Sequence, residues 1–262
     1  MTRQRFAVLF FAAFWCACEP QLTVGAAACL EAAPLIGPEE GGDPIPSLEP
    51  VEAWATSFES GFCDYRFVPG GFCYRDADSE YGIVEWPVRS GRRAAAFSVT
   101  SDPDLEGMQA RCVREGILPE AAYYGAWYYI PDPARNEGNW NLFHFQGGDD
   151  LHGLWDVSLA SSEDGQLSLY IYDFLRRRFR RPAEPRPVPI ASWFHVELYL
   201  RRSADETGAV ALYQDGQLLW EANELITDDS EWGQWYLGNL ADALSPETST
   251  LYVDDVTIRP EP

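Results

Sequence analysis

Short segments with β-strand character, separated by turn signals, follow one another from Trp54 to the end of the chain. They alternate apolar and polar residues or are rich in aromatic and β-branched residues, which is typical of half-buried strands. The segments are "GRRAAAFSVT", "AYYGAWYYIP", "NWNLFHFQ", "LWDVSLA", "QLSLYIYD", "WFHVELYLR", "AVALYQ", "QLLWEA" and "STLYVDDVTI". Asp215-Gly216 between two of them predicts a tight hairpin. No long amphipathic helix interrupts the series, so residues 53–260 are predicted to form one all-β domain, an antiparallel two-sheet sandwich.

The N-terminal part has a different composition. Residues 1–18 join a basic start, "MTRQR", to an apolar run, which is typical of a signal peptide and is short for a membrane span of ~20 residues. Ala17 before Cys18 resembles a bacterial lipoprotein signal with Cys18 as the lipidated residue; cleavage near "GAAAC" is the alternative. Residues 19–52, rich in Pro, Gly and Glu, are predicted to be a disordered tether. We therefore expect an exported protein, either anchored by lipid and facing the periplasm or cell surface, or secreted.

Export permits disulfide bonds, which makes the cysteine count informative. The cysteines outside the signal region allow three possible pairings; they are Cys29, Cys63, Cys73 and Cys112. The Pro-Gly-Gly turn in "CDYRFVPGGFC" can bring two of them into cross-strand contact, so a Cys63–Cys73 bridge is the favoured interpretation. The alternative is that these cysteines are small buried hydrophobic side chains.

Alternation also sorts the side chains of four strands into two faces. In "NLFHFQ", Phe143 and Phe145 share one face, whereas His144 and Gln146 share the other. The same division in three further strands makes one face apolar, as in a sheet packed on a core. We assign to one shared outer face the residues His144, Gln146, Asp156, Tyr170, Tyr172, His195, Glu197 and Tyr199. This face is either an ordinary solvated surface or, because sugars stack on aromatic rings, a carbohydrate-binding surface.

The chain is strongly acidic, with a net charge of −22, and it contains no Lys. This balance argues against binding to nucleic acid or to anionic membrane surfaces, which leaves the lipid anchor as the expected membrane contact. The run "RRRFRR" is a local exception. On a strand, Arg176, Arg178 and Arg180 would project from one side, where guanidinium groups suit carboxylates or sulfates. The alternative is a solvated hairpin whose charge is balanced by nearby acidic residues.

Several segments together resemble the concanavalin A-like jelly rolls of the heparin-lyase and glucuronan-lyase type and of related LamG-like proteins. The matching pieces are "SFESG", "PVRSGRRAAAF", "YYGAWYYIP", "WFHVELYLRRSADETGAVALYQDGQLLW" and "LYVDDVTI", in the expected order. The resemblance implies a two-sheet jelly-roll fold. It does not select one activity, because this sandwich also serves lectins, glucanases and adhesive domains.

Lyases of this type resemble one another in a "Q-x-H" strand motif and a downstream catalytic Tyr. Here the strand reads "HFQ", with His144 and Gln146 in the reverse order. The chemistry implied by the resemblance is β-elimination, in which a uronate carboxylate is neutralised, its C5 proton removed and the leaving oxygen protonated. The candidate catalytic residues are His144, Gln146, Tyr170 and Tyr172.

Sandwiches resembling this one often hold a structural cation between their first and last strands. Glu59 in "SFESG" and Asp254 or Asp255 in "YVDDV" are the candidate ligands, because carboxylate oxygens suit Ca²⁺. The alternative is that they are ordinary turn and edge-strand charges. No other cofactor is required by the expected chemistry.

Our primary prediction is a monomeric, exported jelly-roll domain that binds a polysaccharide, with an acidic one favoured, on its concave face. The residues expected to contact this ligand are Asp156, Arg176, Arg178, Arg180, His195, Glu197 and Tyr199. One alternative is a polysaccharide lyase that acts on a uronate-containing glycan. The other is a non-catalytic structural or interaction domain of the cell envelope.

Overall fold

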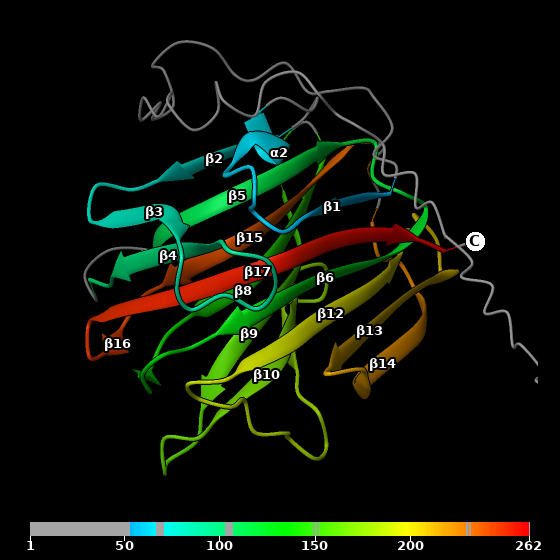
Figure 1. The fold of residues 1–262 in the computed structure, drawn as a ribbon. Helices are drawn as coiled ribbons and strands as arrows, with labels where there is room; N and C mark the ends of the chain where they lie inside the picture. Colours follow the sequence, from blue (N-terminus) through cyan, green and yellow to red (C-terminus); the bar gives the residue numbers. More distant parts are fainter. Residues whose placement is uncertain are drawn as a thin grey trace, which may run out of the picture.

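The computed structural model describes residues 53–66, 71–102, 107–148, 150, 152–228, 230 and 232–261. In this part of the chain two antiparallel sheets pack face to face (Figure 1). The predicted all-β, two-sheet antiparallel sandwich is therefore confirmed. The predicted signal peptide with Cys18, the tether and Cys29 lie outside the described residues.

One sheet has eight strands in the described residues, in the order β14-β13-β12-β6-β17-β4-β3, with β1 paired to β17. Their bounds are β1 (Trp54–Thr56), β3 (Ser79–Val84), β4 (Ala94–Thr100), β6 (Ala121–Tyr129), β12 (Trp193–Arg201), β13 (Gly208–Gln214), β14 (Gln217–Leu225) and β17 (Thr248–Pro260). The predicted hairpin is confirmed, because Asp215 and Gly216 connect β13 to β14 with positive φ angles of 52° and 74°. Two consecutive positive φ values are typical of the type I′ turn that Asp-Gly favours.

The other sheet has seven strands in the described residues, in the order β11-β10-β9-β8-β15-β5-β2. Their bounds are β2 (Gly71–Arg75), β5 (Met108–Gly116), β8 (Trp140–Gly147), β9 (His152–Ser161), β10 (Leu167–Asp173), β11 (Arg178–Arg180) and β15 (Gly233–Ala241). The remaining described elements are the short helix α2 (Cys63–Arg66) and the paired strands β7 (Arg135–Asn136) and β16 (Leu244–Ser245).

The core lies between the two sheets and is built from the apolar side of each strand. Phe143 and Phe145 of β8 are fully buried, as their alternation predicts. Two tyrosines of β6 reach across to the other sheet: the ring centroids of Tyr124 and Trp235 are 5.1 Å apart, and those of Tyr128 and Phe143 are 6.0 Å apart. Each large apolar side chain buried in this way stabilises the fold by roughly 1.5–3 kcal/mol.

The disulfide pairing differs from the prediction. Cys73 on β2 is bonded to Cys112 on β5, with their Cα atoms 4.0 Å apart. The two residues face each other directly because β2 pairs with β5 in antiparallel register. Cys63 is itself disulfide-bonded, although not to Cys73. The predicted Cys63–Cys73 bridge is therefore wrong, because the strand that faces Cys73 is β5 and not the segment before the Pro-Gly-Gly turn.

The assignment of β12 to the same sheet as β8, β9 and β10 is also wrong. β12 lies in the eight-stranded sheet, between β6 and β13. Both sheets are packed on the core, so their strands show the same alternation although their polar faces point in opposite directions. The residues that we assigned to one outer face are thus divided between two.

Candidate functional site

A continuous row of side chains crosses the outer face of the seven-stranded sheet, the side directed away from the core. The row forms because antiparallel register places directly opposed residues on the same side of neighbouring strands. From β11 to β2 it consists of Phe179, Tyr172, Asp156, His144, Tyr236, Val113 and Phe72. Three residues of the predicted site, Tyr172, Asp156 and His144, are thereby brought together, and Tyr236 joins them.

His144 is held by an acidic neighbour. Its Nδ1 lies 2.5 Å from Oδ1 of Asp156, which is opposite it on β9 and is almost completely buried. Its ring also packs edge-on against Tyr236, with centroids 5.4 Å apart, and against Phe174, at 5.7 Å. A carboxylate on one ring nitrogen fixes the orientation of an imidazole, which leaves Nε2 as the nitrogen suited to proton exchange with a ligand.

Tyr236 is the tyrosine next to His144. Its hydroxyl lies 2.8 Å from Oε1 of Gln146 and also contacts Oε1 of Gln234. Gln234 in turn donates to Oε2 of Glu115 at 2.7 Å. Burial raises the pKa of the Tyr236 phenol and also that of the Glu115 carboxyl. Tyr236 therefore stays protonated at neutral pH, as a proton donor must.

Arg111 lies beneath these groups on β5. Its guanidinium donates to Oδ1 of Asn141 and lies 5.7 Å from the centroid of the Tyr236 ring. The Asn141 amide is fixed from the other side, because its Nδ2 donates to the carbonyl of Phe143 at 2.7 Å. Arg111 is only 3% exposed, and among the described residues it has no ion-pair partner and its Nε has no hydrogen-bond partner. The site thus contains a buried cation whose side-chain hydrogen-bond partners, the Asn141 amide and the Tyr74 phenol, are both neutral groups.

The two other predicted tyrosines lie nearer to the β11 edge. Tyr172 belongs to the row but is separated from His144 by β9. Tyr170 lies in the adjacent row, opposite Ser158, and burial raises the pKa of its phenol. Both rings pack against Phe179, with centroids 5.0 Å and 5.6 Å away. Their position suits contact with a ligand more than proton transfer beside His144.

The arginine run does not lie as expected. Arg178 and Arg180 on β11 project to the core side of the sheet, because Phe179 between them faces outward opposite Tyr172. Together with Arg176 they form ion pairs with the fully buried Asp173, at distances from 2.8 Å to 3.8 Å. The prediction that these three arginines line the ligand face is thus corrected: they neutralise a buried carboxylate.

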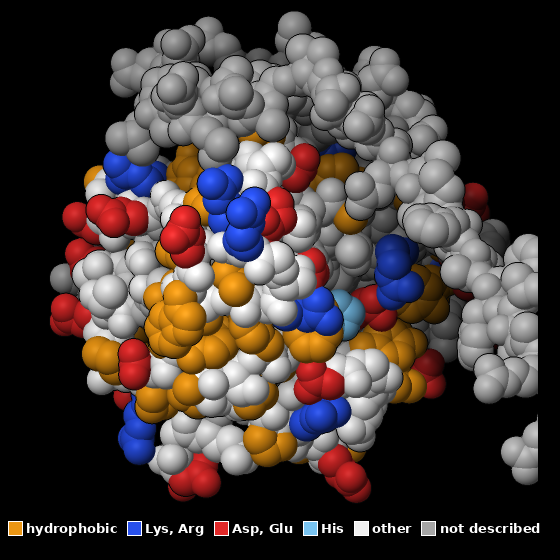
Figure 2. All heavy atoms as spheres, in the orientation of Figure 1, with side chains coloured by type: hydrophobic (Ala, Val, Ile, Leu, Met, Phe, Trp, Pro, Cys, Tyr) orange, Lys and Arg blue, Asp and Glu red, His pale blue; other side chains and the backbone are white. Residues whose placement is uncertain are grey.

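His195, Glu197 and Tyr199 lie on β12 and therefore on the outer face of the eight-stranded sheet. Figure 2 looks onto this face, where hydrophobic side chains gather over β17, β6 and β12 beside arginine and acidic side chains. Glu197 forms an ion pair with Arg259, and the Tyr199 hydroxyl donates to Glu261 at 2.7 Å. These residues do not share a site with His144, because the whole core separates the two faces.

The carboxylates of the expected calcium site bind main-chain N–H groups. Glu59 accepts from the amides of Arg92 and Arg93 at 2.7 Å and 2.9 Å. Asp254 accepts from the amides of residues 89 and 90, and Asp255 forms an ion pair with the side chain of residue 89. Among the described residues no group of three or more His, Cys, Asp or Glu side chains fits a metal ion. The arrangement therefore does not fit the calcium prediction.

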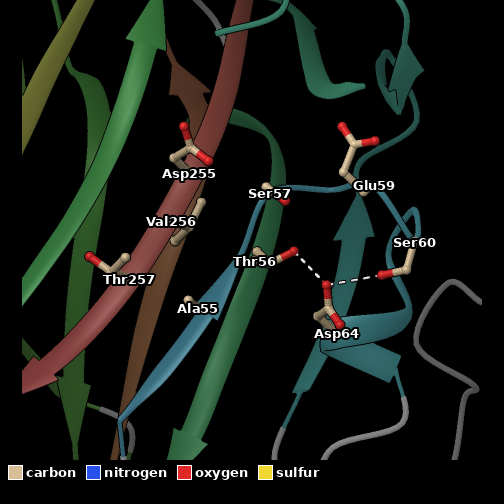
Figure 3. A pocket seen from close by; sticks show the side chains of 9 residues that line it. All are labelled: Ala55, Thr56, Ser57, Glu59, Ser60, Asp64, Asp255, Val256 and Thr257. Carbon is tan, nitrogen blue, oxygen red and sulfur yellow. Dashed lines mark hydrogen bonds between the residues drawn. The ribbon is translucent and has the colours of Figure 1, made fainter. Parts of the chain in front are cut away.

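A pocket of about 410 Å³ lies beside these carboxylates, between β1, β17 and the loop before α2. Figure 3 shows that its acidic side chains, Glu59, Asp64 and Asp255, lie well apart. Asp64 accepts from the hydroxyls of Thr56 and Ser60, at 2.7 Å and 3.0 Å. Each carboxylate thus has its own partners within the protein.

Sequence reasoning missed Arg111, Asn141 and Tyr236, although a usable signal exists. In "MQARCVREG", alternation places Arg111 on the side opposite Cys112, and in "GQWYLGNL" it places Tyr236 opposite Trp235. Asn141 has no such signal. Strict alternation would put Asn141 and His144, three residues apart, on opposite faces. They share a face because the pairing of β8 with both β9 and β15 shifts register between Asn141 and Phe143.

Comparisons with solved structures show the fold. A glucuronan lyase from the fungus Trichoderma reesei superposes with a TM-score of 0.57 at 17% identity, over 72% of this chain and 90% of that one. The cellulose induced protein Cip1 matches with a TM-score of 0.56 at 11% identity, over 79% and 97%. The alginate lyase Aly36B, solved with an alginate trisaccharide, matches with 0.52 at 13% identity, over 84% and 100%. The chain therefore has the concanavalin A-like jelly-roll fold, as the sequence resemblance implies.

Neither a family model nor a curated protein matches the sequence. Among the described residues no helix is both long and apolar enough to cross a membrane. The Cys73–Cys112 disulfide is consistent with an oxidising, extracytoplasmic compartment.

Proposed function

We propose that the protein binds a uronate-containing polysaccharide on the outer face of the seven-stranded sheet and cleaves it by β-elimination. The observation that supports this most directly is Arg111, which is buried and pairs with no described carboxylate. A buried cation without a counter-ion is unfavourable, so an anionic ligand would stabilise it. The carboxylate of a uronic acid matches the planar guanidinium fork.

The neighbours of Arg111 can supply the remaining steps. Arg111, held by Asn141, would neutralise the uronate carboxylate, which makes the C5 proton more acidic. His144, oriented by Asp156, would accept that proton at Nε2. Tyr236 would donate its proton to the glycosidic oxygen as the C4–O bond breaks and a C4–C5 double bond forms. All of these groups lie on neighbouring strands, β5, β8, β9 and β15.

The solved structures of the same fold support this choice of ligand. Two of the matches are named as lyases of glucuronan and alginate, and one of them was solved with an alginate trisaccharide. At identities of 17% and 13% they establish the fold alone. The substrate class therefore depends on the chemistry of the Arg111 site in this chain.

Binding without cleavage is the second candidate. It is favoured by the state of Tyr236, which is 8% exposed and whose hydroxyl contacts two Gln side chains. A ligand would have to displace these contacts before the phenol could reach a glycosidic oxygen. The reverse order of "HFQ" relative to the "Q-x-H" motif favours the same candidate.

The test is incubation of the protein with glucuronan, alginate and a neutral glucan. β-Elimination produces unsaturated ends, which increase the ultraviolet absorbance with either polyuronate but not with the neutral glucan. Tyr236→Phe should abolish the increase, whereas Tyr199→Phe, on the opposite sheet, should preserve it. Retained binding without any absorbance change selects the second candidate. Absence of both binding and cleavage contradicts the proposal.

We also infer that the chain is exported and anchored through Cys18. The support is the "WCAC" sequence and the Cys73–Cys112 disulfide. Cys18→Ser should release the protein from the membrane fraction in the host cell. A native protein that is already soluble, with its N-terminus near "GAAAC", would contradict the anchor.

A further inference from the structure

The β10–β11 hairpin ends the seven-stranded sheet with an exposed aromatic residue. Phe179 is 59% exposed, although it is a large hydrophobic side chain. It lies at the end of the row that contains His144 and Tyr236, and it packs against Tyr172 at a centroid distance of 5.0 Å. An exposed aromatic ring at the end of a ligand face is a typical position for stacking against a sugar.

Arg181 adds a positive charge to this ring cluster. Its guanidinium carbon lies 5.1 Å from the centroid of the Tyr170 ring and 5.5 Å from that of Phe179. Among the described residues Arg181 forms no ion pair. It is an exposed, unneutralised cation in a chain with a net charge of −22.

The other arginines of the hairpin hold it in place. Arg180 donates from Nε and Nη2 to Oδ2 of the buried Asp173, at 3.2 Å and 2.8 Å, and the amide of Arg176 donates to its Oδ1 at 3.1 Å. Arg176 also donates to the carbonyl of Ile226. Because Asp173 fixes the core side of the hairpin, Phe179 on its outer side is positioned before any ligand arrives, which lowers the entropic cost of binding.

We propose that Phe179 and Arg181, with Tyr170 and Tyr172 behind them, form a distal subsite for one uronate residue of the polysaccharide. This inference rests on the proposed function. The sugar would stack on Phe179 and its carboxylate would pair with Arg181. Phe179 is separated from Tyr236 by four strand spacings, about 19 Å at ~4.8 Å each, so the distal sugar is a different residue from the one beside Tyr236.

A distal subsite predicts an effect that depends on chain length. Long polyuronates reach both Arg111 and Arg181, whereas a short oligosaccharide bound at Arg111 does not. The distal subsite lies far from the reacting bond, so it should stabilise the ground state and the transition state equally. Loss of such an interaction raises KM and leaves kcat unchanged. Removal of the distal subsite should therefore weaken the binding of long chains selectively.

The experiment compares Phe179→Ala and Arg181→Gln with the control Arg178→Gln. Arg178 lies in the same hairpin, is half-exposed and projects to the other side of the sheet. The affinity for long alginate and for an alginate trisaccharide is measured by titration calorimetry. Arg181→Gln should weaken long-chain binding roughly two- to fivefold, the range for exposed charged contacts. Phe179→Ala should weaken it roughly two- to tenfold, the range for an aromatic contact. Both variants should leave trisaccharide binding and kcat unchanged. Arg178→Gln should bind like the wild type.

Two results would overturn the distal subsite. The first is unchanged long-chain affinity in both test variants while Arg111→Met loses binding; in that case the proposed function stands and the subsite does not exist. The second is an equal loss in Arg178→Gln, which would show a general effect of charge. Failure of the proposed function is recognised separately, because wild-type protein would then bind no polyuronate or Arg111→Met would bind it normally.

Discussion

The outer faces of both sheets carry His, Tyr, Arg and acidic side chains, but the two faces differ in whether each arginine has an acidic partner. On the eight-stranded sheet the charged groups pair with one another: Arg259 with Glu197, and Arg201 with Glu261. On the seven-stranded sheet Arg111 has a neutral amide as its partner and no described carboxylate. A face whose charges are matched internally has little to gain from an ionic ligand, whereas a face with an unmatched buried cation does. Composition alone therefore does not identify a binding face.

The largest expected difference between the faces is catalytic. Tyr236→Phe removes the proposed proton donor and should reduce kcat on a polyuronate by at least ~10²-fold, the usual contribution of a positioned acid. Tyr199→Phe removes an equivalent hydroxyl from the other sheet and should leave kcat within a factor of about two of the wild type, because it lies outside the reacting groups. Initial rates of absorbance increase measure both. Equal losses would contradict the distinction between the faces.

The next effect concerns the edge of the seven-stranded sheet. The Cys73–Cys112 bond joins the edge strand β2 to β5. On β2, Tyr74 lies opposite Arg111. Replacing both cysteines by Ser should lower the free energy of unfolding by about 2–4 kcal/mol, because the unfolded chain regains freedom. Denaturant titration of the double variant against the wild type measures the loss. A change below about 1 kcal/mol would show that the edge is held by its strand pairing alone.

Arg111 should separate function from stability. Arg111→Met removes a buried charge and should raise the free energy of unfolding by about 1 kcal/mol while abolishing polyuronate binding. By contrast, Arg259→Gln removes an exposed, compensated charge and should lower stability by at most about 1 kcal/mol with binding unchanged. Thermal melts of the two variants measure their stability, and titration calorimetry measures their binding of polyuronate. Strong destabilisation by Arg111→Met would mean that its charge is already compensated in the free protein.

The smallest expected effect is on how the free energy of unfolding changes with pH. Glu115 on the seven-stranded sheet and His195 on the eight-stranded sheet should contribute slopes of opposite sign. Burial raises the pKa of Glu115 above its ordinary 4.5, so in the window above that value the folded chain binds more protons and stability falls as pH rises. Burial lowers the pKa of His195 below its ordinary 6.5, so in the window below that value the unfolded chain binds more protons and stability falls as pH falls.

Glu115→Gln and His195→Gln should each remove one of these slopes. The measurement is the free energy of unfolding from denaturant titrations between pH 4 and pH 8, interpreted with proton linkage at roughly 1.4 kcal/mol per pKa unit. The same slope in a variant as in the wild type would show that the group concerned is not buried in solution.

Part of the candidate site was predictable. Alternation in "NLFHFQ" and "LWDVSLA" correctly places His144 and Asp156 on the side opposite the core. Applied to "GQWYLGNL", it would have found Tyr236 as well. Asn141 was not predictable, because it reaches the same face through register shifts that a strict period of two excludes.

The sequence by itself determined that the chain forms strands, that these strands are amphipathic and which side of each is polar, because these properties depend on neighbours along the chain. Only the tertiary structure decided which sheet each strand joins and which cysteine opposes Cys73. β12 and β8 have the same alternation but belong to opposite sheets, and β5 joins β2 and β15 from distant parts of the chain. The physical reason is that hydrogen-bonded strand pairing is long-range: it places Arg111 beside His144 and Tyr236, and it separates His195 from them by the whole core.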